Sequence, residues 1–485
     1  MGQRTRVHPT FIKLKMQAYI KNICCIGAGY VGGPTMAVIA DKCPNIIVTV
    51  LDINSKRILD WNDKNLSNLP VYEPGLDEII KRCRGINLFF STNIEKEISM
   101  ADMIFLSVNT PTKTKGIGAG KASDLKWIEA STRQVAKYAK GKTIVVEKST
   151  LPVRTAQTIK QILEASNDKT SSLKNNNDFF ILSNPEFLAE GTAINDLEKP
   201  DRILIGGEND SAINALARIY ENWVDSKKIL RTNLWSSELS KLTANAFLAQ
   251  RISSINSISG LCEKTGADIH EVSKAIGMDK RIGSHFLNAG PGFGGSCFKK
   301  DILNLIYLCN HYSLHEAAEY WEGVIKINEW QQSRLTEIIV SKLFGTVAEK
   351  YIAILGFAFK ANTNDTRESP AIKTCNDLIN EGAKLRIYDP RVSKEKIEVD
   401  LKIKEKDNIK SSTLGSWSYA PTILDATKGV DGIVVLTEWS EFKNIDWNQI
   451  SQYTRKPTWL FDSRNICDVD SAKFKNIKLW KLGLS

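Results

Sequence analysis

The chain has 485 residues, of which 42% are hydrophobic and 25% are charged, a composition ordinary for a globular protein. This length predicts two or three domains, because a single hydrophobic core stops growing well before this size. Its apolar runs are too short to cross a bilayer, which predicts a soluble protein and excludes an integral membrane protein.

The formal net charge is +10, but Lys and Arg alternate with Asp and Glu along the whole chain rather than clustering. Such interleaving indicates solvated surface, and no zinc-finger or basic-zipper spacing is present, so neither nucleic acid nor membrane is an expected partner. His311 and His315 have the spacing of helical metal ligands without a third ligand nearby, and we therefore expect no metal.

The nine cysteines are odd in number and scattered, unlike the dense spacing of secreted disulfide scaffolds. The first twenty residues are basic and irregular, and no apolar segment of a secretory signal follows them. Both features predict a reducing compartment, the cytoplasm.

The first chemical motif is a glycine-rich turn. A short apolar run at 22–26 is followed by Gly27, Gly29 and Gly32 in a G-x-G-x-x-G pattern, and then by a helical stretch to about residue 40. In a dinucleotide-binding unit these glycines allow a tight turn, close approach of a pyrophosphate to the helix N-terminus, and close packing of helix on strand.

The next apolar run, 46–51, ends at Asp52, where a carboxylate meets an adenosine ribose in such units. An aspartate there accepts hydrogen bonds from the ribose hydroxyls and repels a 2′-phosphate, so the pattern favours NAD over NADP. Arg57 follows five residues later, and an arginine there can accommodate a 2′-phosphate. On these residues alone, NADP therefore remains an alternative to NAD.

Further apolar runs at 88–90, 103–108, 143–146 and 179–182, with helical stretches such as 123–139 and 153–165, predict a parallel doubly wound sheet. Ligands of such folds bind beyond the carboxyl ends of the strands. The polar loops 109–112 and 147–150 are therefore expected to face a cofactor, with helix capping as the alternative for Ser149 and Thr150.

Three later stretches carry candidate chemistry. Glu186 and Glu190 follow the run 179–182, and Lys241 and Asn245 share one face of a long amphipathic helix over about 236–264. The segment 290–301 contains four glycines, Cys297, two lysines and an aspartate. It is either a nucleophile site, where cations lower the thiol pKa, or a turn with an incidental cysteine.

A second strand-turn-helix unit begins at 351–360, and strands follow at 384–388 and 432–436. Its first turn lacks the full glycine pattern but carries Lys360, with Arg367 and Arg464 as further basic residues. This suits a phosphate ligand other than a whole dinucleotide. The predicted fold is α/β: two Rossmann-like doubly wound domains joined by a central helical domain with a long helix. The expected boundaries are 1–20 (extension), 21–232 (NAD-binding), 233–345 (helical) and 346–485 (second Rossmann-like domain, for the phosphate ligand).

These features resemble the UDP-glucose 6-dehydrogenase family over nearly the whole chain, and most closely its animal and plant branch. The motifs that carry the resemblance occur in order and are GAGYVGGPT (27–35), SVNTPTKT (107–114), EKST (147–150), NPEFLAEGTA (184–193), SSELSKL (236–242), NAFLAQRISSINSIS (245–259), GFGGSCF (292–298), ILGFAFK (354–360) and DTRES (365–369).

The resemblance implies oxidation of UDP-glucose to UDP-glucuronate with two NAD used in turn, through a thiohemiacetal and a thioester on Cys297. Lys241 and Asp301 match the family's base and water-organising pair, and Glu186 matches the glutamate of the aldehyde and thioester steps. Asn245 and Thr150 are implied to position groups or water.

The same resemblance implies the contact residues. Those for NAD are Gly27, Ala28, Gly29, Tyr30, Val31, Gly32, Asp52, Arg57, Val108, Asn109, Thr110, Pro111, Thr112, Ser149, Thr150, Leu151, Glu190, Cys297, Lys300 and Arg367. Those for the UDP-sugar are Glu186, Phe187, Leu188, Ala189, Glu190, Lys241, Asn245, Arg281, Phe286, Asn288, Gly290, Phe293, Gly294, Phe359, Lys360 and Arg464. Arg281 is implied to reach a neighbouring subunit of a homo-oligomer, at least a dimer and by resemblance a hexamer.

Two alternatives remain on sequence alone. One is a dehydrogenase of another nucleotide sugar, UDP-N-acetylmannosamine or GDP-mannose, since specificity depends on pocket shape. The other is a non-catalytic regulator that binds NAD or a nucleotide sugar. Asn288, in place of a lysine common in animal relatives, and Pro291 in the glycine segment depart from the family pattern.

Overall fold

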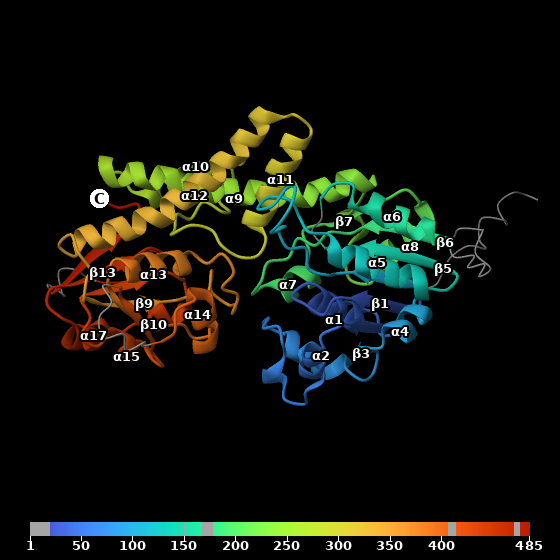
Figure 1. Ribbon diagram of the computed structural model, residues 1–485, viewed down its shortest axis with the longest axis horizontal. Helices are drawn as coiled ribbons and strands as arrows, with labels where there is room; N and C mark the ends of the chain where they lie inside the picture. Colours follow the sequence, from blue (N-terminus) through green and yellow to red (C-terminus); the bar gives the residue numbers. More distant parts are fainter. Residues whose placement is uncertain (1–19, 150–151, 167–177, 406–413, 470–475) are drawn as a thin grey trace, which may run out of the picture. The chain divides into compact units, whose positions relative to one another are not determined.

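The computed structural model describes residues 20–149, 152–166, 178–405, 414–469 and 476–485. The chain divides into two compact units, residues 1–242 and 243–485, and the division falls within the 32-residue helix α9 (Leu234–Thr265). Figure 1 shows one sheet in each unit. No helix in the described ranges, α9 included, is both long enough and apolar enough to cross a membrane.

The first unit is built on an eight-stranded sheet with the order β3-β2-β1-β4-β5-β6-β7-β8. The first six strands thus follow the 3-2-1-4-5-6 order of dinucleotide-binding folds. The strands are β1 (Asn22–Ile26), β2 (Ile47–Leu51), β3 (Leu88–Ser91), β4 (Met103–Leu106), β5 (Lys142–Glu147), β6 (Asp178–Ser183), β7 (Ile203–Gly207) and β8 (Ile229–Thr232).

Helices cover both faces of this sheet, which is why its strands are continuous apolar runs. Alternation along β1 sends Ile23 and Cys25 into one hydrophobic core, and Cys24 and Ile26 into the other. The helices are α1 (Gly32–Lys42), α2 (Ser55–Asn62), α3 (Leu76–Cys83), α4 (Ile94–Met100), α5 (Lys126–Tyr138), α6 (Thr155–Ala165), α7 (Ala193–Glu198) and α8 (Asp210–Tyr220), with short 3₁₀ turns at Leu66–Asn68 and Ser226–Lys228.

One junction departs from the parallel arrangement expected from sequence. Strands β6 and β7 are antiparallel, and they pair only through Leu182 with Gly207 and Ser183 with Gly206. The connection 184–202 contains only the short helix α7, and an antiparallel partner needs no crossover helix, so the chain turns back at the carboxyl edge. The remaining pairs of this sheet are parallel.

The second unit contains a six-stranded parallel sheet with the order β11-β10-β9-β12-β13-β14, which repeats the 3-2-1-4-5-6 order. Its strands are β9 (Tyr351–Leu355), β10 (Lys384–Tyr388), β11 (Ser416–Tyr419), β12 (Gly432–Val435), β13 (Thr458–Asp462) and β14 (Ile477–Lys481). Its helices after α9 are α10 (Ile269–Gly277), α11 (Phe298–His311), α12 (His315–Lys342), α13 (Pro370–Asn380), α14 (Lys394–Leu401), α15 (Ile423–Thr427), α16 (Ser440–Lys443) and α17 (Trp447–Tyr453).

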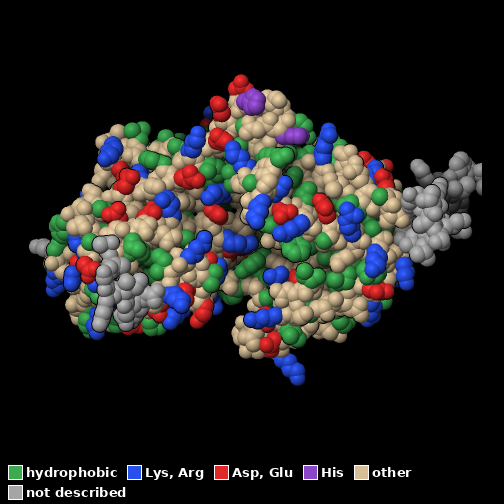
Figure 2. Space-filling view, in the orientation of Figure 1, with side chains coloured by type: hydrophobic (Ala, Val, Ile, Leu, Met, Phe, Trp, Pro, Cys, Tyr) green, Lys and Arg blue, Asp and Glu red, His purple; other side chains and the backbone are tan. Residues whose placement is uncertain are grey.

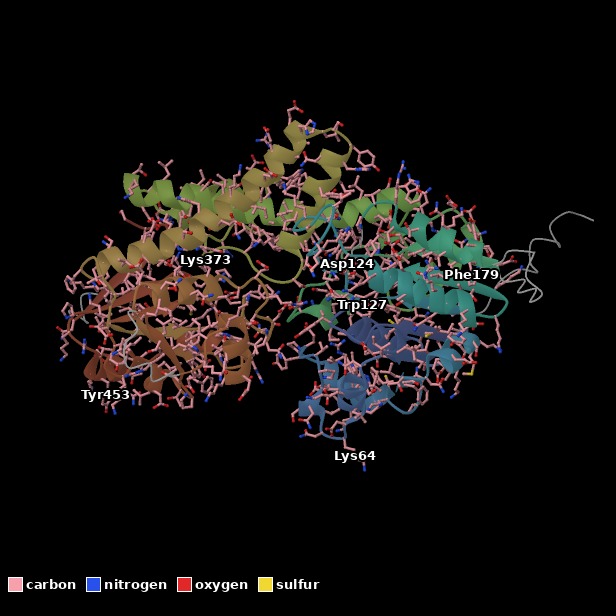
Figure 3. The ribbon with its side chains drawn as sticks, viewed as in Figure 1. Lys64, Asp124, Trp127, Phe179, Lys373 and Tyr453 are labelled. Carbon is pink, nitrogen blue, oxygen red and sulfur yellow. The ribbon has the colours of Figure 1, made fainter. Side chains whose placement is uncertain are left out.

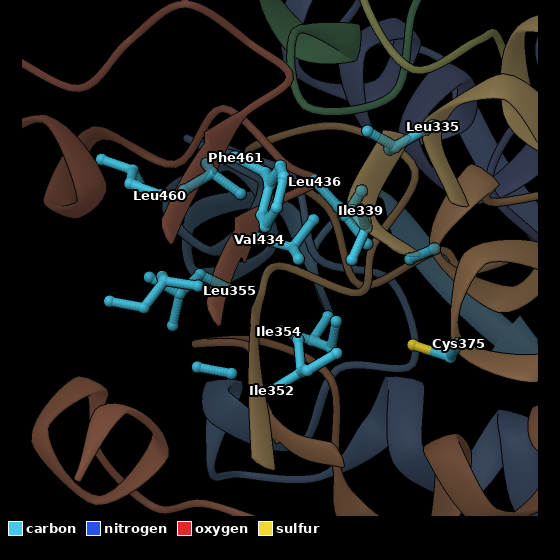
Figure 4. Packing of buried hydrophobic residues seen from close by; sticks show 14 of the residues in the cluster. Leu335, Ile339, Ile352, Ile354, Leu355, Cys375, Val434, Leu436, Leu460 and Phe461 are labelled. Atoms are coloured by element: carbon cyan, nitrogen blue, oxygen red, sulfur yellow. The ribbon is translucent and has the colours of Figure 1, made fainter. Parts of the chain in front are cut away.

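The core of the second unit joins its sheet to the helical segment. Leu335 and Ile339 of α12 belong to the same buried cluster as Ile352 and Ile354 of β9 and Val434 of β12 (Figure 4). Because α12 shares this core with β9 and β12, the helical segment and the second sheet form one packed body. On the face shown in Figure 2, basic and acidic side chains are interspersed on both units, as expected for solvated surface.

Candidate functional site

The turn between β1 and α1 has three glycines in three different environments. Gly27 has a φ of +113°, and a Cβ there would lie 2.3 Å from the Ser107 carbonyl oxygen. A Cβ on Gly32 would lie 2.0 Å from the Gly27 oxygen, whereas a Cβ on Gly29 would meet nothing within 4 Å. Packing therefore requires Gly27 and Gly32, and Gly29 leaves open space at the N-terminal end of α1, which fits a pyrophosphate.

Asp52 lies directly after β2, as predicted. Its Oδ2 accepts hydrogen bonds from the Ala28 amide at 3.1 Å and from Arg57 Nη1 at 3.1 Å, and its Oδ1 accepts from the Asn54 amide. Its side chain is 9% exposed and that of Arg57 is 43% exposed. The carboxylate is thus tied to the glycine turn, where it fits an adenosine ribose.

The second sheet has an aspartate in the equivalent place, and its environment differs. Asp389 follows β10, is 2% exposed, and accepts from the amides of Phe357 and Ala358 and from the Trp439 indole through Oδ2 alone. Its Oδ1 accepts from the Arg391 and Val392 amides. Because its acceptor sites are used inside the fold, this carboxylate is structural, which explains why the second sheet does not repeat the ribose site of the first.

We expect Asp52→Asn to raise the Kd for NAD about 10- to 100-fold, because a hydrogen bond to a charged acceptor contributes roughly 1.5–3 kcal/mol. The side-chain NH₂ group of the new asparagine would also face the Ala28 N–H or the Arg57 guanidinium, and two donors cannot hydrogen-bond to each other. Discrimination against NADP should weaken as the negative charge disappears. Titration of NAD and NADP, followed by protein fluorescence, measures the effect. The control is Asp77→Asn, since Asp77 is an exposed acid on α3. Equal NAD affinities in the two variants would contradict the assignment of Asp52 to the ribose.

The two polar loops expected to face the cofactor are only partly as predicted. Glu147 is the last residue of β5 and is buried, so it is not a loop residue. Ser149 uses its hydroxyl to donate to the Val108 carbonyl oxygen at 2.7 Å. Asn109 is exposed and Thr110 is buried. The remaining predicted residues of these loops are Pro111 and Thr112, which are half-buried, and Thr150 and Leu151, which lie outside the described residues.

In the loop 107–125, the residues that precede helix α5 pair with residues near the start of the loop. The Asp124 amide donates to the Pro111 carbonyl oxygen at 2.7 Å, and Thr112 and Ser123 form an isolated bridge. Figure 3 labels Asp124 and Trp127 where the loop enters α5. Backbone hydrogen bonds therefore hold Pro111 and Thr112, two of the predicted cofactor residues of this loop.

Glu186 and Lys241 form a buried ion pair in the first unit. Lys241 Nζ lies 3.6 Å from Glu186 Oε1, and the two side chains are 5% and 6% exposed. Glu186 Oε2 is buried, and none of the described residues donates a hydrogen bond to it. An orphaned carboxylate oxygen beside a buried ammonium group can accept a hydroxyl or a water, which fits proton chemistry on a bound substrate.

The loop that carries Glu186 is anchored by buried groups that sequence reasoning did not identify. Asn184 Oδ1 accepts from Lys148 Nζ at 3.1 Å and from the Tyr220 hydroxyl at 2.6 Å, while its Nδ2 donates to the Leu204 oxygen. Glu73 accepts from the amides of Gly191 and Ala193. The same loop places the Phe187 ring 5.4 Å from Lys241 Nζ, and includes the predicted contacts Leu188, Ala189 and Glu190.

We expect Asn184→Ala to destabilise the protein by roughly 2–4 kcal/mol, because it removes three hydrogen bonds. Among the described residues, the buried ammonium group of Lys148 would keep only the Tyr220 hydroxyl as a hydrogen-bond partner. The loss should appear as a lower urea midpoint for the transition of the first unit. Asn222→Ala removes an exposed amide that bonds two carbonyl oxygens near the end of α8, and it should cost less than about 0.5 kcal/mol. Equal losses in both variants would contradict the anchoring role.

Cys297 differs from the other cysteines of the chain. It is half-buried, whereas the other eight are buried, and all nine are free thiols. Burial raises the pKa of Cys25 to about 12 and that of Cys43 to about 11. Cys297 instead occupies the N-cap position of α11, with Ser296 Oγ 3.4 Å from its sulfur. The positive end of a helix favours a thiolate there.

Asp301 lies one turn further along α11 and is 2% exposed. Asn245 Nδ2 donates to its Oδ2 at 2.6 Å, and Lys300 Nζ lies 3.5 Å from its Oδ1. The second unit therefore brings together three predicted residues in a buried polar cluster one helical turn from the thiol.

The glycine segment before Cys297 is held by three buried amide side chains. Asn256 Oδ1 accepts from the Gly290 amide, and Gln331 Nε2 donates to the Gly290 oxygen. Asn328 accepts from the Phe293 amide and donates to the Phe293 oxygen. None of these was a predicted site residue, although they lie on predicted helices. These three amide side chains are buried, and burial is the property that would have marked them as important. Burial of a polar helical residue cannot be inferred from the sequence alone.

The same segment packs on the second sheet. A Cβ on Gly294 would lie 2.9 Å from Phe359 Cβ, and one on Gly290 would lie 3.3 Å from Arg464 Nη1. Arg464 donates through Nη2 to the Phe359 oxygen and through Nε to the Leu436 oxygen. Three predicted substrate residues, Gly290, Phe359 and Arg464, thus meet beyond β9, β12 and β13, where open α/β sheets bind ligands.

Other predicted residues have different surroundings. Arg367 forms a two-pronged ion pair with Asp365, and Lys360 Nζ lies 5.7 Å from the Phe359 ring centroid. Arg281 is 89% exposed and bonds Asp279, its neighbour in sequence. Phe286 and Asn288 are also exposed. Their ligand contacts therefore remain predictions. Within the described ranges, no cluster of three or more His, Cys, Asp or Glu side chains could hold a metal ion.

Comparison with protein families identifies three domains of one family. Residues 21–224 match the NAD binding domain of the UDP-glucose/GDP-mannose dehydrogenase family, residues 235–330 its central domain, and residues 353–469 its UDP binding domain. The three matches together span most of the chain.

Individual relatives agree with these matches. The chain is 53% identical to UDP-glucose 6-dehydrogenase 3 of Arabidopsis thaliana over 473 residues, covering 95% of this chain and 96% of that one. It is 55% identical to UDP-glucose 6-dehydrogenase of Bos taurus over 456 residues, covering 93% and 90%. A solved UDP-glucose dehydrogenase from Pyrobaculum islandicum matches with a TM-score of 0.80, 27% identity, and coverage of 97% and 99%. The chain therefore belongs to the UDP-glucose/GDP-mannose dehydrogenase family.

Proposed function

We propose that this protein oxidises UDP-glucose to UDP-glucuronate, removing four electrons from C6 and using two NAD in turn. The observation that carries the proposal is the half-buried Cys297 at the N-terminus of α11, one turn from the buried Asp301–Asn245 pair. A plain two-electron alcohol dehydrogenase has no need of a nucleophile. Identity of 53–55% to UDP-glucose 6-dehydrogenases over most of the chain supports the choice of sugar.

NAD, when bound, supplies a hydride acceptor for each of the two oxidations. The glycine turn leaves space for its pyrophosphate at Gly29, and the carboxylate of Asp52 suits the adenosine ribose. Arg57 forms an ion pair with that carboxylate. If the protein uses NADP at all, Arg57 is the residue that would contact the 2′-phosphate.

Proton transfer is assigned to the buried Lys241–Glu186 pair and to Asp301. As the C6 alcohol becomes an aldehyde, its hydroxyl proton passes to Lys241 in its neutral form or to a water ordered beside it. The ammonium form of Lys241 then stabilises negative charge on the C6 oxygen when sulfur adds. Glu186, with its orphaned Oε2, orients the hydroxyl or the hydrolytic water.

Covalent chemistry is assigned to Cys297. Its thiolate forms a bond to the aldehyde carbon, and the carbonyl oxygen takes up a proton to give a thiohemiacetal, which keeps the aldehyde from escaping. Loss of a second hydride and of that proton leaves a thioester. Water, ordered by Asp301, Asn245 and Thr150, then breaks the C–S bond and releases the carboxylate product and the thiolate.

The nucleotide half of the substrate is assigned to the second sheet. Arg464 and Lys360 supply positive charge, and Phe359 supplies an aromatic face, at the carboxyl ends of β9 and β13. Phe293 and Gly294 of the glycine segment complete the proposed substrate contacts together with Phe286 and Asn288. Arg281 is proposed to reach the site of a neighbouring subunit.

We also propose a homo-oligomer, at least a dimer, and a cytoplasmic location. The exposure of Arg281 at 89% is consistent with a role outside its own subunit, and nine free thiols suit a reducing compartment. We likewise propose the domain boundaries 21–232, 233–345 and 346–485, which follow from the sequence.

The test mixes purified protein with limiting UDP-glucose and excess NAD, and counts NADH formed per sugar consumed. The expected ratio is two, with UDP-glucuronate as the product. A ratio of one, or no NADH, contradicts the four-electron proposal. The same assay with UDP-N-acetylmannosamine and GDP-mannose separates the sugar specificities, and binding of NAD without turnover of any sugar would favour the non-catalytic alternative.

A further inference from the structure

We propose that Arg251 is a positioning residue that holds the substrate loop, residues 278–288, in the shape that binds the sugar nucleotide. This role rests on the substrate contacts proposed above, because the loop carries three of them, Arg281, Phe286 and Asn288. Arg251 itself is not among the predicted site residues. It lies on α9, in the part of that helix that belongs to the second unit together with the loop.

The substrate loop forms neither helix nor strand, so its backbone polar groups need other partners. Arg251 is the partner of three carbonyl groups. Its Nε donates to the His285 oxygen at 2.9 Å, its Nη1 to the Ile282 oxygen at 2.9 Å, and its Nη2 to the Gly283 oxygen at 2.7 Å. One half-buried guanidinium group therefore ties together the backbone of residues 282–285.

The guanidinium group suits this task because its donors point in fixed directions. Arginine presents five N–H donors in a rigid, planar fork, and it stays charged in proteins. Hydrogen bonds from a charged donor are stronger than those between neutral groups. A lysine would place a single nitrogen at the end of a flexible stem, and one nitrogen cannot occupy the three positions from which Arg251 donates.

The far end of the substrate loop has a backbone shape that needs such support. Phe286 has a φ of +60° and Gly283 a φ of +75°. The left-handed conformation is costly for a bulky side chain, and it persists only where the surroundings impose it. Hydrogen bonds on both sides of Phe286 do so. Arg251 holds the carbonyl group that precedes it, and the Ser273 hydroxyl donates to the Leu287 oxygen at 2.6 Å.

The place of Phe286 bears on the proposed reaction, because its ring contacts the first residue of α11. The ring centroids of Phe286 and Phe298 are 6.4 Å apart in an edge contact, and Phe298 directly follows Cys297. The ring of Phe293, in the glycine segment, lies 5.9 Å from the same Phe298 ring. A substrate loop released by Arg251 would therefore lose its place beside the thiol.

This arrangement predicts an effect on substrate affinity. A loop that already has its binding shape does not have to be ordered when the substrate binds. If only a fraction of the molecules has the competent loop, the apparent affinity falls by that fraction. Removing the guanidinium group should lower the fraction about 10- to 100-fold, since even one charge-assisted hydrogen bond can change an equilibrium by this factor.

The binding test measures the Kd for UDP-glucose by calorimetry in the absence of NAD. In Arg251→Met this Kd should rise about 10- to 100-fold. The Kd for NAD should stay within about twofold, because none of its predicted contacts lies in the substrate loop. A role in general stability would not separate the two ligands in this way.

Two further variants sharpen the comparison. Arg251→Lys keeps the charge but should still raise the Kd for UDP-glucose at least about threefold, because it lacks the planar fork. Arg218→Met, at an exposed position on α8, is the control and should match wild type. A wild-type Kd for UDP-glucose in Arg251→Met, or in Arg251→Lys if the methionine variant does not fold, would overturn the proposal.

Hydrogen exchange, followed by mass spectrometry, tests the loop without any ligand. The amides of Ile282 and Gly283 donate to the Asp279 oxygen at 2.9 and 2.8 Å, so they are protected while the loop keeps its shape. In Arg251→Met these amides should exchange about 10- to 100-fold faster than in wild type, with strands β9 to β13 unchanged. Unchanged exchange at both amides would overturn the role of Arg251. If the wild type binds no UDP-glucose, the proposed function fails instead, and the exchange result still decides whether Arg251 holds the loop.

Discussion

Replacing Cys297 with serine is expected to reduce complete turnover of UDP-glucose by at least about 10³-fold, because loss of a catalytic nucleophile costs on the order of 10³- to 10⁶-fold. A serine hydroxyl is not ionised near neutral pH and adds poorly to an aldehyde, so the second oxidation or the hydrolysis should stall. Rapid-quench experiments with excess enzyme should show at most two NADH per site and no steady release of UDP-glucuronate.

The matched control is Cys309→Ser on the same helix. Cys309 is 9% exposed, and burial raises the pKa of its thiol, so it should take no part in the reaction. This variant is expected to retain wild-type kcat within about threefold, with some loss of stability from the buried hydroxyl. Full turnover by Cys297→Ser would remove Cys297 from the mechanism.

Much of the first unit could be predicted because local signals coincide with the global fold. The run 22–26 is apolar at every position but one, the glycine pattern follows it directly, and Asp52 comes after the next apolar run. Each signal depends on neighbours along the chain. The predicted strands β1 to β6 and helices α5, α6 and α9 are confirmed to within a few residues.

The elements that sequence reasoning passed over have weaker local signals. Strands β7 and β8 are Ile203–Gly207, which ends in two glycines, and Ile229–Thr232, with an exposed arginine in its middle. The antiparallel β6–β7 junction could not be predicted either, because direction depends on how the connection 184–202 folds and not on the apolar pattern of the strands.

The residues of the candidate site also divide into those with a local sequence signal and those without one. Cys297 and Asp52 were identified because glycines, charges or strand ends mark them in sequence. Asn256, Asn328 and Glu238 could not be identified, because a polar side chain on a helix is ordinarily exposed and only the folded chain shows these to be buried and bonded. What sequence misses are the groups that hold the reactive residues in place.

The largest effect expected in the first unit follows replacement of Lys241 with methionine, which should lower kcat about 10²- to 10⁴-fold. Methionine keeps the apolar length of the side chain but provides neither a proton acceptor nor a positive charge for a developing oxyanion. It also leaves the buried Glu186 carboxylate without the cation 3.6 Å away. Stopped-flow recording of NADH over one turnover separates the first oxidation from later steps.

The two roles assigned to Lys241 predict different traces. If it acts on both oxidations, the first NADH should appear as slowly as the second, whereas a role only in stabilising the sulfur adduct would leave the first NADH fast. Lys264→Met, at an exposed position near the end of the same helix, should match wild type within about twofold, since removing an exposed surface charge usually has little effect. A normal trace for Lys241→Met would exclude both roles, because a buried ammonium group that can be deleted without kinetic consequence is neither the base nor the oxyanion partner.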